Sequence, residues 1–494
     1  MKWIIFLLLV NNQIFSQADY DRHFLSGYDV FKGDTISLND VSFPDYEFQS
    51  KGIKGLNMFN ATGVTMSNKD GELQFSANGC RVYDASNKVM KNGVLQLEFF
   101  EQYITCMGTS YNDPQINSAF PTLAGNDQYY YIHQRFSDFP YDYLLTSYLF
   151  KIDMAADNGN GELFGPIDSF NIDTTYLPGH VVVKHADNES WWVVDWRNLS
   201  STYHAQRIGK VGLLEHIIDT CGKAPTLKYV EGWGQHSFNL AGTQYCRYAP
   251  NMGVFLYDFD RSAGKFSNFR ELPFEADKIY PISSGGVAFS PNGRYLYVGL
   301  DKYLYQYDLQ SNDIPNSQVF IDSVLNPPHG PILPDMAYLF QGPDCKLYVY
   351  SHGGTEFYHV IHYPNNPGLS CQFEQYLELP QYKIGPFPNN PNMRLGTPYE
   401  KWCDSLSSST DRPVMFPRIM HVYPNPAIDE IHLSIPIPGG IAMIYDGLGR
   451  LIQQNSLAEG IYAPSIDVAN LAPGIYSIIW TKGEEREQCQ FVKY

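Results

Sequence analysis

The sequence has little charge, and particularly little positive charge. Charged residues make up 17% of the 494 residues, and 34 Lys and Arg stand against 52 Asp and Glu, which gives a net charge of -18. The chain has no run of Lys and Arg, although phosphate backbones are bound by clustered basic side chains. We therefore expect no nucleic-acid partner, and we interpret the acidic balance as a feature that favours solubility.

Long apolar runs are also scarce. The run Trp3–Val10 follows Lys2 and is too short to span a bilayer, which is the pattern of a signal peptide. Ser16 and Gln17 offer a cleavage point, and no Cys lies near them to carry a lipid anchor. We therefore predict a signal peptide at 1–17 and no membrane span, with export through the periplasm to the cell surface or the medium. The alternative is that the run forms an N-terminal core strand.

The sequence lacks the short motifs of several enzyme classes. It contains no GxSxG, HExxH, Walker A or CxxC pattern. The HGG string that follows Ser351 resembles an esterase oxyanion loop, but no elbow serine accompanies it. The stretch "DMAADNGNGE" (Asp153–Glu162) has no alternating oxygen ligands in either register of a calcium loop, so we expect a turn. The sequence therefore identifies no catalytic residue, no metal ligand and no cofactor.

Aromatic residues, glycine and proline are abundant instead. Aromatics make up 15% with 37 Tyr, and 40 Gly and 32 Pro punctuate the chain, which favours an all-β fold. The stretch "FSPNGRYLYVGLDKYLYQYDLQSNDI" (Phe289–Ile314) shows the unit most clearly, with a turn at Pro291–Gly293 and strands at Tyr295–Gly299 and Tyr303–Asp308. Looser copies begin at Asn68, Asn126, Ala186, Ala249 and Gly342.

The spacing of these units is that of four-stranded propeller blades. We therefore predict a seven-bladed β-propeller over 18–403. Six units are visible, and strands from both ends of the domain would close the seventh blade. A two-sheet sandwich is the alternative. Phe289–Asp308 resembles WD-type and lactonase-like blades, and the whole pattern is similar to secreted propeller proteins of Gram-negative bacteria with type IX secretion.

Tryptophan and histidine are the candidate ligand-binding side chains of the propeller. In a strand, Trp192 and Trp196 share one face and Trp191 lies on the other, where they could stack on a sugar or pack between blades; we favour packing. A propeller can gather histidines at one end of its channel, and His180, His185, His204 and His216 were considered for this role. No spacing among them demands a metal, so we expect each to be solvated or buried without a ligand.

The last part of the chain has a different character. The Ser-rich stretch 404–418 reads as a linker, and residues 419–494 are predicted to form a small β-sandwich. Four elements in this part resemble, in order, the type A C-terminal sorting domain of type IX secretion: Tyr423–Pro426, Ile444–Arg450, Leu471–Tyr476 and Phe491–Lys493. The resemblance implies that the type IX machinery is a partner. The candidate sorting residues are Tyr423, Pro424, Asn425, Pro426, Asp446, Gly449, Gly474, Tyr476 and Lys493.

Eight cysteines fit an oxidising compartment. Six of them fall into three pairs of similar separation, although spacing cannot prove the pairing. The candidate disulfides are Cys80–Cys106, Cys221–Cys246 and Cys345–Cys371, and Cys403 and Cys489 are left unassigned.

Together these observations predict an exported propeller that acts as a binding or interaction module for a protein or glycan not identified by the sequence. One alternative is a hydrolase or lactonase-like enzyme with a metal in its channel, since a fold does not determine a function. The other is a structural or adhesion component of the cell surface.

Overall fold

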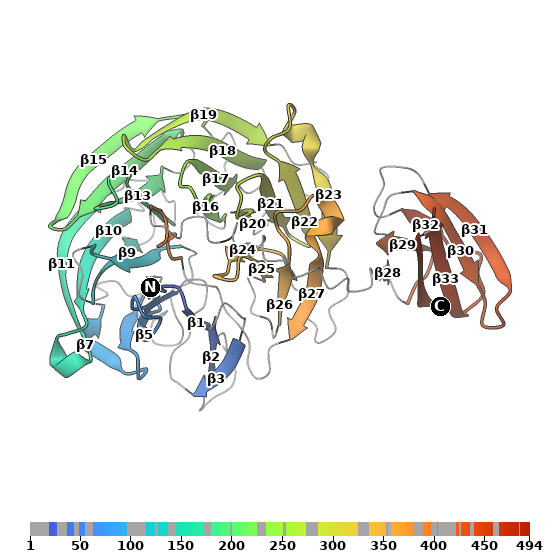
Figure 1. Ribbon diagram of the computed structural model, residues 1–494, viewed down its shortest axis with the longest axis horizontal. Coiled ribbons are helices and arrows are strands. Elements are labelled where there is room, and N and C mark those ends of the chain that lie inside the picture. Colours follow the sequence, from blue (N-terminus) through green and yellow to red (C-terminus); the bar gives the residue numbers. More distant parts are fainter. Residues whose placement is uncertain are drawn as a thin grey trace, which may run out of the picture.

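A computed structural model shows an all-β chain that forms a propeller and a separate C-terminal sandwich (Figure 1). The named helical elements are three short 3-10 helices: η2 (Asp157–Gly159), η4 (Pro315–Ser317) and η5 (Gly368–Cys371). None of the helices in the described part of the chain has the length and apolar character needed to cross a membrane. The structure describes residues 19–26, 37–43, 49–54, 63–95, 115–123, 127–136, 145–171, 179–197, 200–224, 234–249, 253–272, 285–324, 335–351, 355, 357–378, 389–396, 403, 421–423, 426–434, 439–457, 464–483 and 485–494.

The described strands of the propeller form one three-stranded blade and six four-stranded blades. The three-stranded blade is β1 (His23–Ser26), β2 (Ser37–Ser42) and β3 (Gln49–Lys54). The first three four-stranded blades are β4 (Val64–Ser67), β5 (Leu73–Ala77), β6 (Arg81–Asp84) and β7 (Val89–Val94); β8 (Asn117–Pro121), β9 (Gln128–Phe136), β10 (Leu145–Asp153) and β11 (Glu162–Asn171); β12 (Val181–Lys184), β13 (Trp191–Trp196), β14 (Thr202–Gly209) and β15 (Gly212–Thr220). The last three are β16 (His236–Phe238), β17 (Gln244–Ala249), β18 (Gly253–Asp260) and β19 (Lys265–Leu272); β20 (Gly285–Phe289), β21 (Tyr295–Leu300), β22 (Tyr303–Asp308) and β23 (Val319–Ser323); β24 (Tyr338–Gln341), β25 (Leu347–Tyr350), β26 (Phe357–Ile361) and β27 (Phe373–Glu378).

The blades follow one another around a ring in chain order (Figure 1). The outermost strands β7 and β11 of two neighbouring blades meet in parallel at Lys91 and Glu162, which makes one eight-stranded sheet of two blades. At the other junction, Phe24 and Val41 of the three-stranded blade pack on the blade β24–β27, and β1 adjoins β4. The three-stranded blade therefore closes the ring, and the seven-bladed prediction is confirmed.

The repeat seen most clearly in the sequence is a blade, as predicted. The predicted strands Tyr295–Gly299 and Tyr303–Asp308 are β21 and β22, with β21 one residue longer. Its entry turn is held by Ser290, whose Oγ accepts the N–H of Tyr295 (2.8 Å), and by Gly293, whose φ of +71° suits glycine. Local turn chemistry thus sets the register of this blade.

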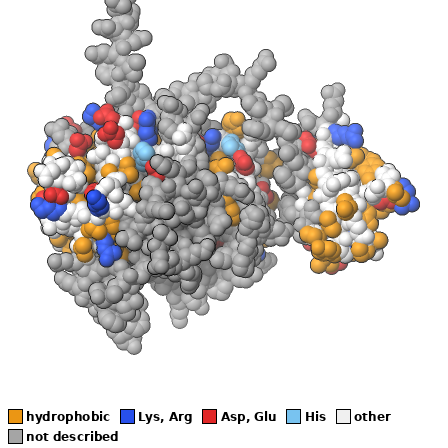
Figure 2. Space-filling view, turned by 90° about the horizontal axis from the view of Figure 1, so that it is seen from below, with side chains coloured by type: hydrophobic (Ala, Val, Ile, Leu, Met, Phe, Trp, Pro, Cys, Tyr) orange, Lys and Arg blue, Asp and Glu red, His pale blue; other side chains and the backbone are white. Residues whose placement is uncertain are grey.

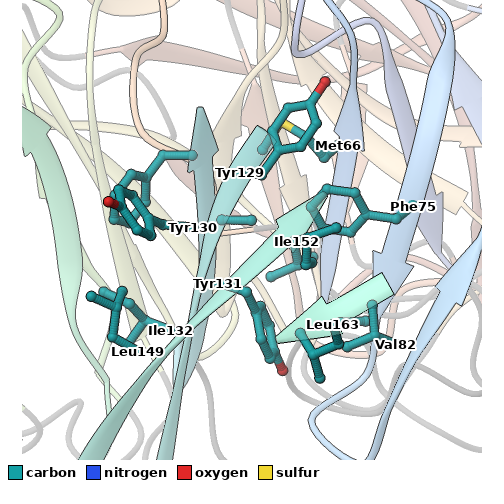
Figure 3. Close-up of a cluster of buried hydrophobic side chains, with 14 of the residues drawn as sticks. Met66, Phe75, Val82, Tyr129, Tyr130, Tyr131, Ile132, Leu149, Ile152 and Leu163 are labelled. Atoms are coloured by element: carbon teal, nitrogen blue, oxygen red, sulfur yellow. The ribbon is translucent and has the colours of Figure 1, made fainter. Parts of the chain in front are cut away.

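Apolar side chains fill the spaces between blades. The cluster in Figure 3 takes its members from the blade β4–β7 (Phe75, Val82) and the blade β8–β11 (Tyr129, Ile152). Burial of such large side chains supplies most of the stabilisation that a propeller needs. A single blade cannot bury its own faces, so each blade depends on packing against its neighbours.

The three tryptophans of β13 belong to this packing. All three are at most 1% exposed. Trp192 and Trp196 lie in the cluster that faces β16–β19, whereas Trp191 lies in the cluster that faces β8–β11. The predicted division of faces is confirmed, and the alternative of sugar stacking on these rings does not fit their burial.

The C-terminal domain is a sandwich of two antiparallel sheets. One sheet contains β28 (His421–Tyr423), β29 (Glu430–Ser434) and β32 (Ser465–Asp467); the other contains β31 (Leu451–Leu457), β30 (Gly440–Tyr445), β33 (Gly474–Lys482) and β34 (Glu485–Lys493). Ile431, Leu433, Ile444 and Trp480 fill the space between the sheets. The predicted sandwich is therefore present. The predicted signal peptide and linker lie outside the described residues.

Two of the three predicted disulfides are wrong. Cys345 pairs with Cys403, with Cα atoms 5.5 Å apart, while Cys371 is free and buried among the side chains of β20–β25. Cys221 and Cys246 are also free. Cys246 packs on the face of the β16–β19 blade that meets β20–β23, whereas Cys221 lies on the other side of this blade, in the cluster shared with β12–β15.

The remaining predicted pair, Cys80–Cys106, is not fully described. Cys80 is disulfide-bonded, and Cys106 lies outside the described residues. The predicted pairs were chosen by their similar sequence spacing, whereas the actual pairing depends on which faces of the strands pack against each other.

Candidate functional sites: the central channel and the C-terminal domain

The central channel is lined by the first strand of each four-stranded blade, and a segment of the chain runs along it. This channel segment, residues 389–396, begins beside the first residues of these strands: the Asn389 N–H donates to the Gly63 carbonyl (3.4 Å) and its Nδ2 to the His180 carbonyl (2.7 Å). It ends at the opposite end, where Gly396 lies against Asn188 in the turn after β12. The segment thus passes down the channel in the direction of the inner strands.

Side chains of the channel segment are bonded to consecutive blades. Asn389 Nδ2 donates to Ser118 Oγ of β8 (2.9 Å), and Asn390 Nδ2 donates to the Thr65 carbonyl of β4 (2.7 Å). The Met393 carbonyl accepts from Lys184 Nζ of β12 (3.0 Å), and Asn392 Nδ2 donates to the Leu240 carbonyl beyond β16 (2.8 Å). The segment therefore ties four blades together from inside.

The channel segment also meets the N-terminal part of the propeller. Arg394 makes a two-pronged ion pair with Asp21, with one N–O distance of 2.6 Å, just before β1. We predicted that strands from both ends of the domain would complete the seventh blade. Among the described residues only N-terminal strands form that blade, and the C-terminal contribution is a segment in the channel, not a strand.

Two glutamines reach across the channel. Gln115, before β8, exchanges two hydrogen bonds with the backbone of His236 (2.8 and 2.9 Å), which opens β16. Gln235, before β16, does the same with the backbone of Leu339 in β24 (2.6 and 2.9 Å). Each side-chain amide thus bonds a backbone N–H and C=O as a neighbouring strand would. The bonds connect each glutamine's blade to the next blade but one in the ring, across this end of the channel.

A cavity of about 190 Å³ remains beside the channel segment. Its walls come from β12, β16, β20 and β24 and from the segment itself, and they include Phe24, Gln235, Phe289 and Asn392. Small-molecule sites usually enclose about 300–1,000 Å³. The space is thus sufficient for several waters but small for a substrate.

Two histidines near the channel, His180 and His236, are buried at the start of β12 and β16, and burial lowers the pKa of each to about 3. The other histidines considered as ligands lie elsewhere in the β12–β15 blade. His204 and His216 contact each other through ring nitrogens (3.1 Å), and His185 Nδ1 accepts the N–H of Asp187 (2.9 Å). Across the described ranges, no three His, Cys, Asp or Glu side chains are grouped so that they could hold a metal ion.

One carboxyl group is buried between blades. Asp195 of β13 accepts a hydrogen bond from Gln134 of β9 (2.6 Å), and the Gln206 amide, turned so that its nitrogen faces the carboxyl, donates to it at 3.2 Å. Burial raises the pKa of Asp195 to about 8, because two amide donors do not offset the loss of water. The group is mostly protonated at neutral pH, and sequence reasoning gave no sign of it.

Of the two other stretches singled out in the sequence, one is a turn and one is only partly described. Ser351 Oγ donates to Asp335 Oδ1 (2.7 Å), and the HGG string after it lies outside the described residues. Asp153–Glu162 connects β10 to β11, and Asp153 Oδ1 accepts the N–H of Ala155 (3.0 Å). This is the turn that the sequence predicted.

In the C-terminal domain, the turn Asp446–Arg450 between β30 and β31 is held by one carboxylate. Asp446 Oδ1 accepts the N–H groups of Leu448 and Arg450 (both 2.9 Å), and Oδ2 accepts from Arg450 Nε (2.7 Å). These bonds, led by those of Arg450, lower the pKa of Asp446. Gly449 has a φ of +77°, which an L side chain rarely adopts. Asp446 and Gly449 therefore fix the shape of the turn.

The other candidate sorting residues lie next to this turn. Gly474 of β33 pairs with Lys493 of β34, and Ala427, directly after Pro426, pairs with Lys493 from the other side. Tyr476 stacks on Phe491 with ring centroids 5.5 Å apart, and its hydroxyl donates to the Ala472 carbonyl (2.8 Å).

The four motif elements thus meet at one end of the sandwich. Gly447 of the turn faces the backbone oxygen of Ile475, which follows Gly474. Lys493 is 6% exposed, and its Nζ donates to the backbone oxygen of Tyr494. Tyr423 ends β28, whereas Pro424 and Asn425 lie outside the described residues. Residues up to seventy positions apart are brought together by pairings that no local pattern reveals.

The C-terminal part of the chain matches a known family. Residues 421–493 match the secretion system C-terminal sorting domain. This domain directs export through type IX secretion to the cell surface or the extracellular space, and it implies the type IX machinery as a partner. The sorting tail proposed from the sequence is thereby confirmed. No curated protein matches the sequence.

Solved structures similar to the chain share little sequence with it. The periplasmic gluconolactonase of Pseudomonas aeruginosa has 13% identity and a TM-score of 0.41, and the similarity covers 74% of this chain and 97% of that one. A functionally unknown protein from Desulfotomaculum acetoxidans has 11% identity and a TM-score of 0.37, with coverages of 74% and 99%. A β-propeller domain from Myceliophteria thermophila has 10% identity and a TM-score of 0.36, with coverages of 68% and 91%. These similarities are too low to carry a functional argument.

Proposed function

We propose that the propeller of this exported protein is a binding module that contacts a protein partner through its outer rim. The observation that carries the proposal is the channel segment 389–396, which occupies the place where propellers commonly hold small ligands. The segment and the two glutamines lie in the channel and connect the blades there. The binding surface is therefore placed on the outside of the blades.

The outer strands of three consecutive blades offer such a surface. The strands β7 and β11 are joined at Lys91 and Glu162, and Gly212 of β15 lies against Asp168 of β11. We define the apolar rim as the exposed hydrophobic residues of this region: Val89, Val94, Phe164, Ile167, Val211, Leu214 and Ile218. Exposed apolar residues on adjoining strands mark interaction sites more often than chance.

The composition of the rim favours a protein over a glycan. Sugars are bound by exposed aromatic faces, whereas the rim is mainly aliphatic and the three tryptophans of β13 are buried. The alternative of a lactonase-like enzyme with a channel metal would require space that the channel segment fills. A structural or adhesion role would use the same kind of protein contact.

Binding of purified full-length chain to surface proteins of its native host tests the proposal. A captured partner would be purified, and its affinity would be measured by calorimetry for the wild type, for Leu214→Asp/Ile218→Asp, and for Tyr363→Asp as an exposed control outside the rim. We expect a loss of affinity of about tenfold or more in the rim variant alone. Turnover of an ester or lactone, or glycan binding that the rim variant does not change, would contradict the proposal.

A further inference from the structure

The end of the sorting domain where the four motif elements meet is rich in exposed apolar side chains. Ile428 is 63% exposed, Leu448 80%, Leu451 50% and Ile475 61%. Figure 2 shows hydrophobic side chains gathered on the surface of this domain. We define these four residues as the apolar end.

The four residues lie at the same end of the sheet β31–β30–β33–β34, although they come from different elements. Leu448 lies at the tip of the turn whose Gly447 faces Ile475, and Leu451 pairs with Tyr445 at the end of β30. Ile475 pairs with Val492, whose carbonyl accepts the N–H of Ala427 (2.7 Å), and Ile428 follows Ala427. The apolar end therefore extends across the end of this sheet, from β31 to the residues beside β34.

The apolar end is held in shape before any partner arrives. The Asp446 carboxylate fixes the turn that carries Leu448, and β33 and β34 pair over their full lengths beneath Ile475. A rigid surface loses little conformational entropy on binding, which favours recognition.

The charge around the apolar end indicates the chemistry of the partner. Arg450 and Asp446 neutralise each other at the base of the turn (2.7 Å), so no unpaired charge projects from it. The edge strand β34 carries Glu485, Arg486 and Glu487 at its other end, away from the apolar end. Asp429, directly after Ile428, is exposed at the margin of the apolar end. A matching surface would be apolar and uncharged at its centre.

We propose that the apolar end is the surface by which the secretion machinery recognises this chain, through an uncharged apolar pocket on a component of the type IX system. The match of residues 421–493 to a sorting domain establishes that this machinery handles the domain. The contact residues are those of the apolar end: Ile428, Leu448, Leu451 and Ile475. The inference does not depend on what the propeller binds.

Export of full-length variants in the native host tests this assignment. Leu448→Asp/Ile475→Asp places two carboxylates on the apolar end, and both sites are exposed enough to leave the fold intact. Ile441→Asp is the matched control, because Ile441 is an exposed apolar residue at the opposite end of β30. Thermal unfolding of each purified chain would verify the fold, and Leu448→Met/Ile475→Leu would retain the apolar character.

We expect the double aspartate variant to accumulate in the periplasm, with the surface-exposed fraction reduced about tenfold or more, while the control and the conservative variant are exported normally. Normal export of the double aspartate variant would overturn the proposal. The proposal would also fail if the variant only converted a dimer of the chain into a monomer without changing export. Removal of residues 421–494 is the parallel arm: if it blocks export while the double variant does not, the sorting assignment stands and the recognition surface lies elsewhere.

Discussion

At the scale of single residues, the propeller holds polar side chains inside that most β-proteins would avoid. Asp195 is 1% exposed and bonded to amides of two strands, so its proton stays on in the folded chain at neutral pH. A protonated carboxyl between blades is a hydrogen-bonding group rather than a charge. Its ionisation then links the stability of the ring to pH.

Asp195 should make the propeller less stable as pH rises. The unfolded chain loses this proton near pH 3.9, whereas the folded chain keeps it to about pH 8. Between these values the unfolded state binds fewer protons, so the free energy of unfolding falls by up to about 1.4 kcal/mol per pH unit and levels off above pH 8. Asp195→Asn should remove this slope in urea unfolding curves recorded from pH 5 to pH 9. Parallel pH dependences for the two proteins would contradict the assignment.

At the scale of elements, the channel segment connects blades from inside the ring. The innermost position of the three-stranded blade is held by β1, which adjoins β4, and the side chains of the segment are bonded to inner strands of other blades. Asn389 carries most of these bonds, with partners in His180, Ser118 and Gln115. Side-chain hydrogen bonds of the channel segment therefore hold the ring together, in addition to the packing and strand pairing of the blades.

Asn389→Ala should destabilise the propeller by about 1–3 kcal/mol, because it leaves buried backbone and hydroxyl partners unsatisfied. Asn316→Ala removes an exposed turn amide that bonds Asp313 and should cost less than about 0.5 kcal/mol. Urea unfolding of the purified chains would measure both. Equal effects in the two variants would show that the channel segment does not lock the ring.

The disulfide Cys345–Cys403 fixes the chain shortly after the channel segment. It closes a loop across a sequence separation of 58 residues. Cys403→Ser should therefore lower the free energy of unfolding by about 2–4 kcal/mol, while Cys489→Ser should have little effect. Urea unfolding of the two variants and the wild type without reductant would measure the change.

A peptide map of the unreduced chain checks the pairing itself. We expect a linked peptide containing Cys345 and Cys403, and alkylation of Cys221, Cys246, Cys371 and Cys489 after denaturation. A peptide that links Cys345 to Cys371 would restore the pairing predicted from sequence spacing.

At the scale of the whole molecule, local features were predictable and long-range ones were not. The strands predicted at Tyr295–Gly299 and Tyr303–Asp308 follow from strand-forming residues between turns, including the Asn292–Gly293 turn, and the sorting domain follows from four elements in order. The position of the channel segment 389–396 depends on side-chain contacts across hundreds of residues. Cys403 follows the channel segment, so its pairing with Cys345 depends on the same long-range contacts. Sequence spacing could not reveal this pairing.

The candidate sites show the same division. The sequence supplied Asp446, Gly449, Gly474 and Lys493 as sorting residues, because each belongs to a short motif. It did not show that they meet at one end, since that follows from the pairing of β33 with β34 and of Ala427 with Lys493. It also gave no sign of Gln115 and Gln235, whose role depends on which blades face them across the channel.

The central claim is that residues 421–493 direct the export of the propeller from the cell. The most direct measurement compares the full chain with a chain that ends at Arg418, both expressed in the native host, by the fraction that external protease can reach or that appears in the medium. The account predicts that the full chain reaches the surface or the medium and that the truncated chain stays in the periplasm with its propeller folded. Equal export of the two chains would contradict it.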